Sequence, residues 1–600
     1  MKENAKYLPI EDYGIIGNMK TTALVSLDGA IDFMCFPNFD SPTIFAKLLD
    51  DKNGGTFSVT PQLSFSRTKQ LYIPGTAILL TRFFSDDGIA ELTDYMPIKG
   101  LNGASFCAIV RKLKTIRGKI TYKIKCAPRF DYAAAEHHIE KKGPNELTFS
   151  AINDGDTMVR LIADFPLRFK GKDGYAEVTL NHGEEAIIVL ESVKKDESDL
   201  IHDLDFYKHT TYHDTKHFWK KWISKSTYSG RWTDLVSRSA ITLKLLTSSE
   251  YGSMVAAPTF SVPESMEGDR NWDYRYTWIR DAAFTMYAFL RLGFTEEASN
   301  FLKWIQERSA DPVLHLMYAI NGDKAAEEQV IGHLEGYMGR GKVRIGNAAR
   351  DQFQMDIYGE LIDTIYIYNK NHTKISYELW QTIQKHIDCV IDYWQKADHG
   401  IWEFRNGEKH FLHSRLMCWV AMDRAIKIAN DRSFPYPGPE WKAIRDKIYI
   451  DIYENFWDDE IGAWVQYKGA KEVDASALLM PLTHFITADE PRWLSTMRVI
   501  EDQLSTDVLV YRYRNEDGLK GKEGTFNMCS FWFIEALAKN KEADKALEYF
   551  EKMTGYANHL GLFSEQIGKR GEHLGNFPQA FTHLALISAA LELDKQLDRI

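Results

Sequence analysis

Hydrophobic and polar residues alternate with a period of two through the first third of the chain, as they do in half-buried β-strands. Two apolar runs, 22–27 and 30–36, flank the turn dipeptide Asp28-Gly29, and this arrangement predicts a β-hairpin. Further runs of strand length follow up to about Ser192, separated by turn residues. A series of short strands this regular predicts an antiparallel β-sandwich.

From about Thr233 to the end of the chain, the apolar positions recur at helical spacing instead. The segments predicted to be helical are 235–246, 280–292, 295–309, 356–369, 377–397, 411–429, 440–456, 475–482, 491–503, 528–540, 541–554 and 580–593. Their number and the loops between them fit an (α/α)6 barrel, in which an inner ring of helices is surrounded by an outer ring. The predicted fold is therefore multidomain: an N-terminal antiparallel β-sandwich over residues 1–200, a helical linker over 201–232, and an all-α (α/α)6 barrel over 233–600.

Composition narrows the classes of function. The chain has 600 residues and a formal net charge of −11, with no dominant run of Lys and Arg, which argues against a nucleic-acid partner. Aromatic residues make up 13% of the sequence, an excess that favours a carbohydrate ligand. The six cysteines have no metal-binding spacing, and no P-loop, G-x-S-x-G or HExxH motif occurs, so no metal site is expected. No apolar segment is long enough to cross a membrane and no signal peptide is recognisable, which favours a cytoplasmic enzyme; the oligomeric state stays open.

The stretch 271–292, NWDYRYTWIRDAAFTMYAFLRL, places aromatic residues and charges together at the start of a predicted helix. Burying such charges costs several kcal/mol unless each one is paired or meets a polar ligand. Aromatic rings that pack on a sugar ring, beside carboxylate and guanidinium groups that bind its hydroxyls, would explain the pattern. Tyr274, Trp278, Arg280 and Asp281 are therefore candidate sugar-binding residues, and a structural ion pair at the helix start is the alternative.

Glu403 lies between Trp402 and Phe404 in the segment GIWEFR. An apolar environment disfavours the ionised form and raises the pKa of a carboxyl group, which a general acid requires near neutral pH. An exposed glutamate between two anchoring aromatic residues is the alternative.

Glu565 lies in the glycine-flanked segment GLFSEQIG, where Ser564 and Gln566 favour an ionised carboxylate. Two glutamates whose environments act in opposite directions form the acid/base pair of glycoside hydrolysis. A surface glutamate is the alternative for Glu565. Arg512, in VYRYRNED, is a candidate substrate clamp or a structural ion-pair partner.

Together these stretches resemble the family-15 glycoside hydrolases, inverting α-glucosidases that include glucoamylases, glucodextranases and a group of bacterial trehalases. The motifs PIEDYGIIGN and SLDGAIDFMCFPNFDSP are similar to the trehalase-like sandwich domain of bacterial members. The barrel motifs are RNWDYRYTWIRDA, GIWEFR, HFLHSRLMCWVAMDRA, GLFSEQIG and LGNFPQAFTHLALI. The resemblance covers essentially the whole chain.

The resemblance implies that Glu403 is the general acid and Glu565 the general base of a single displacement, with carboxyl groups about 6.5–9.5 Å apart. It implies no metal or organic cofactor. It also implies these substrate-binding residues: Tyr274, Trp278, Arg280, Asp281, Trp402 and Arg512.

The expected activity is exo-acting hydrolysis of an α-glucan, an α-gluco-oligosaccharide or trehalose, a small-molecule carbohydrate, with release of β-glucose. Within this class the N-terminal motifs favour a trehalase. A disaccharide phosphorylase would replace the base carboxylate by phosphate, which the presence of Glu565 disfavours. Glu403 and Glu565 together also disfavour a non-catalytic glycan-binding protein.

Overall fold

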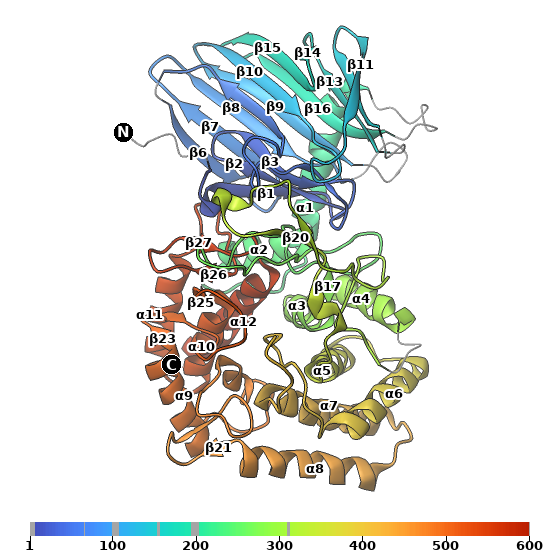
Figure 1. The fold of residues 1–600 in the computed structure, drawn as a ribbon, viewed down its shortest axis with the longest axis vertical. Coiled ribbons are helices and arrows are strands. Elements are labelled where there is room, and N and C mark those ends of the chain that lie inside the picture. Colours follow the sequence, from blue (N-terminus) through green and yellow to red (C-terminus); the bar gives the residue numbers. More distant parts are fainter. Residues whose placement is uncertain are drawn as a thin grey trace.

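Two antiparallel sheets form the N-terminal part of the molecule and lie face to face (Figure 1). The structure is a computed structural model, which describes residues 7–64, 66–98, 107–152, 157–193, 203–308 and 313–598. The first sheet has the order β1-β2-β3-β5-β10-β15-β14, with β4 paired to β3: β1 (Tyr13–Gly17), β2 (Thr22–Ser26), β3 (Ala30–Cys35), β4 (Thr43–Phe45), β5 (Thr56–Pro61), β10 (Lys119–Ala127), β14 (Arg168–Lys170) and β15 (Asp173–Asn181). The second has the order β11-β12-β13-β16-β9-β8-β7-β6: β6 (Arg67–Tyr72), β7 (Leu79–Phe84), β8 (Ile89–Tyr95), β9 (Ala108–Arg117), β11 (His137–Gly143), β12 (Glu146–Ala151), β13 (Met158–Ala163) and β16 (Glu185–Val193).

Strand β1 is buried along its whole length because it lies between the sandwich and the helical part of the chain. A Cβ atom at Gly14 would lie 2.7 Å from the Leu560 side chain on one side and 2.9 Å from Leu79 of the sandwich. Asn558 donates a hydrogen bond of 2.8 Å to the carbonyl of Tyr13. The two parts of the molecule therefore share this strand as a contact surface.

The helical part alternates between elements that are buried nearly all round and elements with one exposed face. The inner elements are α3 (Ile279–Arg291), α5 (Asp356–Asn371), α7 (Leu412–Arg432), η7 (Ala475–Leu479), α10 (Asn527–Lys539) and α12 (Ala580–Leu597). The outer helices are α2 (Thr233–Leu245), α4 (Thr295–Arg308), α6 (Tyr377–Tyr393), α8 (Gly438–Asn455), α9 (Pro491–Leu504) and α11 (Ala543–Thr554). Each inner element packs on the next and α12 returns to α3, which closes the ring. The predicted fold class, a β-sandwich followed by an (α/α)6 barrel, is confirmed.

One inner helix is shorter than predicted. The segment 475–482 forms only the 3₁₀ helix Ala475–Leu479, whose first turn is capped by the Asp474 side chain. Pro481 follows, and because proline lacks an N–H and disfavours helical geometry at the preceding residue, the helix cannot continue through it.

The connector between sandwich and barrel contacts both of them. A π-helical turn, Phe206–Thr211, leads into α1 (Tyr212–Ile223). The Tyr95 hydroxyl of the sandwich lies 2.8 Å from that of Thr211, while Trp222 stacks on Phe294 beside the barrel helices, with ring centroids 4.1 Å apart. The division at 200 and 232 stays a proposal, and its first boundary falls in 194–202, outside the described residues. Among the helices that the structure describes, none has the length and apolarity needed to cross a bilayer.

A buried arginine ties the loop before α3 to the sandwich. Arg275 pairs with Asp273 at 2.7 Å, and both side chains are at most 1% exposed. Its other donors reach the sandwich, at 2.8 Å to the Ser41 carbonyl and 3.1 Å to the Tyr132 hydroxyl. This loop carries Tyr274 and Trp278, so the sandwich helps to fix the position of two predicted site residues.

Arg275→Met should destabilise the protein strongly, because it leaves the Asp273 carboxylate buried without its ion-pair partner. Removing one member of a buried pair typically costs about 3–5 kcal/mol. The free energy of unfolding in urea measures the effect. Lys114→Met, which breaks an exposed ion pair with Glu185, is the control and should cost less than about 1 kcal/mol. An Arg275→Met protein that unfolds at the wild-type urea concentration would contradict this prediction.

Candidate active site

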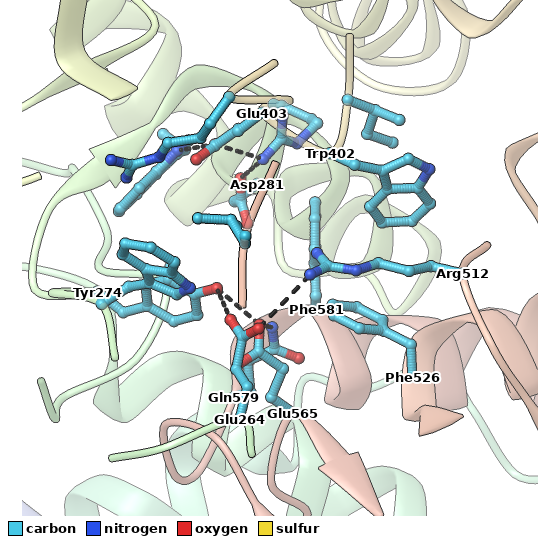
Figure 2. A pocket seen from close by; sticks show the side chains of 17 residues that line it. Glu264, Tyr274, Asp281, Trp402, Glu403, Arg512, Phe526, Glu565, Gln579 and Phe581 are labelled. Atoms are coloured by element: carbon cyan, nitrogen blue, oxygen red, sulfur yellow. Dashed lines mark hydrogen bonds and ion pairs between the residues drawn. The ribbon is translucent and has the colours of Figure 1, made fainter. Parts of the chain in front are cut away.

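All eight predicted site residues line one pocket of the barrel, which holds about 650 Å³ of empty space (Figure 2). Its remaining lining residues were not predicted: Ala256, Glu264, Trp272, Ile401, Arg405, Leu519, Phe526, Gln579 and Phe581. Figure 2 shows Glu403 and Glu565 on opposite sides of this pocket. The arrangement leaves space between the two carboxyl groups for a ligand.

The first wall comes from the start of α3. The two-residue strand β17 (Thr277–Trp278) leads directly into the helix, so Trp278, Arg280 and Asp281 are presented together. The Arg280 guanidinium lies 3.4 Å from Asp281 and 3.4 Å from Glu403, and donates a 3.2 Å hydrogen bond to Gln354. Asp281 Oδ2, the oxygen nearest Arg280, is buried and has no hydrogen-bond partner among the described residues. The side chain lines the pocket beside Glu403, where it could meet a ligand hydroxyl.

The environment of Glu403 differs from the predicted one. Its backbone has a left-handed φ of 59°, which turns the side chain away from its aromatic neighbours and into the pocket, where it is 22% exposed. Trp402 instead donates to Asp474 at 2.7 Å, and the Phe404 ring packs on Phe411. The Trp278 indole N–H donates to Glu403 Oε1 at 2.8 Å. The expected apolar surroundings of Glu403 are therefore wrong, and a tryptophan N–H and a guanidinium surround it.

The environment of Glu565 also differs from the predicted one. This carboxyl is 1% exposed, and burial, followed by repulsion from Glu264, raises its pKa well above its usual value. Tyr274 donates to its Oε1 at 2.7 Å and the Gln579 amide at 3.4 Å. Its Oε2 has no hydrogen-bond partner among the described residues. The sequence neighbour Ser564 bonds to the backbone instead, so local polarity did not predict this environment.

A glycine keeps Glu565 in place. Gly575, with a φ of 76°, passes so close that a Cβ atom there would lie 2.4 Å from Glu565 Oε2. It belongs to the loop between β27 (His573–Leu574) and α12, and β27 pairs with β26 (Gln566–Ile567) immediately after Glu565. A small three-stranded sheet thus holds the loop of Glu565 against the barrel.

Arg512 forms the third wall and lies among aromatic rings. Its guanidinium is 5.2 Å from the Phe526 ring centroid and 5.6 Å from that of Trp402. It donates to Glu523 at 2.7 Å and approaches Glu264 at 3.5 Å. Held between two carboxylates, Arg512 is fixed before any ligand arrives.

A group that could bind a metal lies beneath Arg280. Ligand atoms of Asp356, Glu360 and His413 all lie within 4.8 Å of one another, and the three side chains are buried without hydrogen bonds among the described residues. However, Asp356 approaches ring atom Nδ1 at 3.6 Å and Glu360 approaches Nε2 at 3.7 Å. Because the imidazole lies between the two carboxyls, it does not direct one nitrogen to a centre shared by both.

Comparison with known proteins identifies the family of this chain. The family model described as "Glycosyl hydrolases family 15" matches residues 230–591, and "Trehalase-like, N-terminal" matches 3–204. The chain belongs to glycosyl hydrolase family 15. The family-15 chain is 36% identical to a trehalase of Thermoplasma volcanium over 98% of its own length and 94% of that protein, and 35% identical to a trehalase of Mycolicibacterium smegmatis over 98% and 91%.

A solved structure confirms the fold of this family-15 chain. A bacterial glucoamylase complexed with acarbose superposes with a TM-score of 0.73 at 14% identity, covering 99% of this chain and 95% of that one. Family membership and the trehalase relatives make this chain a glycoside hydrolase with a carbohydrate substrate.

Asp281→Asn should abolish most activity and leave the folded state largely intact, because the side chain lines the pocket and the isosteric amide keeps its packing. A loss of at least about 10²-fold in kcat/KM is expected for a contact with reacting sugar. Hydrolysis assays and calorimetry on the same preparation measure the two effects. A fall in melting temperature that parallels the loss of activity would mean that Asp281 is only a structural ion-pair partner.

The stability of the protein should also depend on pH through the titration of Asp281. Burial raises the pKa of Asp281 to about 7, and Arg280 opposes the rise. An unfolded aspartate titrates near pH 3.9, so between about pH 4 and 7 the folded state holds a proton that the unfolded chain has lost. This contribution to stability is complete below about pH 4 and is lost as the pH rises through 7. The free energy of unfolding of the wild type should therefore fall relative to that of Asp281→Asn between about pH 4 and 7. A difference that stays constant, or that grows in favour of the wild type, would contradict this prediction.

Proposed function

We propose that this chain hydrolyses trehalose by a single displacement that inverts the anomeric carbon. Glu403 would protonate the glycosidic oxygen as the C1–O bond breaks. Glu565 would take a proton from a water whose oxygen forms the new bond to C1 from the opposite face. The products are β-glucose and glucose. Inverting glycosidases hold their carboxyl groups about 6.5–9.5 Å apart to leave room for that water.

One observation carries the proposal: in each carboxyl group the protein holds one oxygen and leaves the other to a ligand. Trp278 and Arg280 both contact Oε1 of Glu403, so Oε2 is available to carry the proton. Tyr274 and Gln579 both contact Oε1 of Glu565, while its buried Oε2 has no hydrogen-bond partner among the described residues and keeps its capacity to accept a proton. Two carboxyls that face one pocket in this way suit an acid and a base.

Trehalose is proposed as the substrate because the relatives that match nearly the whole chain are called trehalases. Arg280 and Asp281 would bind hydroxyls of the glucose that is cleaved, with Trp278 and Tyr274 beside its ring. An α-glucan or α-gluco-oligosaccharide is the alternative substrate. A cytoplasmic location stays a prediction.

A hydrolysis panel tests the activity and its substrate together. Trehalose, maltose, isomaltose, maltooligosaccharides and dextran are incubated with the enzyme, with and without phosphate, and the product anomers are followed by NMR. We expect trehalose to be preferred and β-glucose to appear first from one of its two halves. If α-glucose appears first, inversion is wrong; if glucose 1-phosphate forms, the enzyme is a phosphorylase.

The two glutamates should differ in their response to a leaving group that needs no proton. Removing either proton-transfer group typically costs about 10²–10⁴ in rate on trehalose. Glu403→Gln should nevertheless hydrolyse α-glucosyl fluoride well, while Glu565→Gln should fail on it. Azide, which needs no deprotonation, should partly restore Glu565→Gln and yield β-glucosyl azide. Recovery of a covalent glucosyl-enzyme from Glu565→Gln would show a retaining mechanism instead.

A further inference from the structure

Glu264 is a third carboxyl group in the pocket, in the loop that precedes the predicted stretch 271–292. It is 1% exposed, and its two oxygens have different neighbours. Oε1 lies 3.5 Å from the Tyr274 hydroxyl, the same hydroxyl that donates to Glu565, and Oε2 lies 3.5 Å from Arg512. Figure 2 shows Glu264 beside Glu565 on the side of the pocket opposite Glu403.

The contacts of Glu264 are too long to use its full capacity as an acceptor. A charge-assisted hydrogen bond is usually about 2.7–2.9 Å long, and both contacts of Glu264 are at 3.5 Å. Arg512 is bonded more closely to Glu523, and Tyr274 is bonded more closely to Glu565. Glu264 therefore remains able to accept a further hydrogen bond from a group in the pocket.

The proposed reaction requires a second acceptor on this side of the pocket. An attacking water directs a lone pair to C1 and has two O–H bonds, of which only one can be directed to the base. The other O–H, among buried side chains, is unfavourable if nothing accepts it. The neighbouring Gln579 amide N–H and the Arg512 guanidinium are donors and cannot fill this role. The Tyr274 hydroxyl donates to Glu565, and its neutral oxygen is a weaker acceptor than a carboxylate.

We propose that Glu264 accepts the second O–H of the attacking water, so that Glu264 and Glu565 hold this water together. The inference rests on the proposed function. No proton passes to Glu264: the water oxygen bonds to C1, one proton moves to Glu565, and the other stays on the new hydroxyl while Glu264 accepts its hydrogen bond. Burial raises the pKa of both carboxyls, and repulsion from Glu264 raises that of Glu565 further, so Glu264 also makes Glu565 a stronger base.

Glu264→Met tests the inference because methionine has nearly the same length and cannot accept this hydrogen bond. We expect kcat to fall by about 10²-fold on trehalose and on α-glucosyl fluoride alike, with KM nearly unchanged, since the water attacks in both reactions. Glu264→Gln should recover part of the rate, because its amide oxygen still accepts. Glu297→Gln changes a buried carboxyl outside the pocket, where Lys244 and Trp222 hold it; it is the matched control and should keep kcat.

A double variant separates a shared role from a structural one. If Glu264 acts on the same water as Glu565, then Glu264→Met/Glu565→Gln should be about as slow as Glu565→Gln alone, because residues that act as a unit are not additive. Losses that multiply in the double variant would overturn the proposal. So would a loss confined to trehalose, which would place Glu264 on the leaving sugar, or a rise in KM with kcat unchanged, which would place it on a sugar hydroxyl.

The experiments distinguish a wrong proposed substrate from a wrong role for Glu264. If the wild type cleaves another α-glucoside but not trehalose, the proposed substrate is wrong, and α-glucosyl fluoride still decides the role of Glu264. If Glu264→Met melts well below the wild type, the isosteric Glu264→Gln supplies the kinetic comparison. Equal kcat in Glu264→Gln and the control Glu297→Gln would then overturn the proposal.

Discussion

The site depends on burying several charges where each one has a partner. Arg280 reaches Asp281 and Glu403, Arg275 reaches Asp273, and Arg512 reaches Glu523. Desolvating any of these groups alone would cost several kcal/mol. Each arginine therefore has one acidic partner close in sequence, and the fold adds a second contact from a distant part of the chain: Glu403 for Arg280, the sandwich for Arg275 and Glu264 for Arg512. The loop before α3, the turn at Glu403 and the loop of Glu565 are thus held in register by electrostatics as well as by packing.

These networks also organise the proposed acid and base before substrate arrives. Donors that are already bonded to Oε1 of each carboxyl restrict the rotamers of Glu403 and Glu565. Catalysis by prearranged dipoles avoids the reorganisation that water would require. The sandwich takes part in this arrangement through Arg275, although it contributes no residue to the pocket lining within the described part of the chain.

Sequence reasoning succeeded where the signal was local and failed where it depended on neighbours in space. The period-two and helical patterns predicted both halves of the fold, and the charged aromatic stretch predicted four residues of one pocket wall. The predicted environments of Glu403 and Glu565 were wrong because neighbours in sequence are not the groups that surround a side chain in space. Trp402 lines the same pocket but donates its N–H to Asp474, while the Trp278 indole, distant in sequence, contacts Glu403. Glu264 was missed because SVPES resembles an ordinary loop, and only the fold brings it to Tyr274.

The position of β1 has a consequence for how the protein is made. Tyr13, near the start of the chain, is bonded to Asn558, which lies 545 positions later. At a synthesis rate of about 5–20 residues per second, the partner of this strand leaves the ribosome roughly half a minute to two minutes after the strand itself. During translation the nascent sandwich therefore leaves the face of β1 at Gly14 uncovered until the segment with Leu560 has been made. Protection of this apolar face from other chains during that interval would favour correct folding.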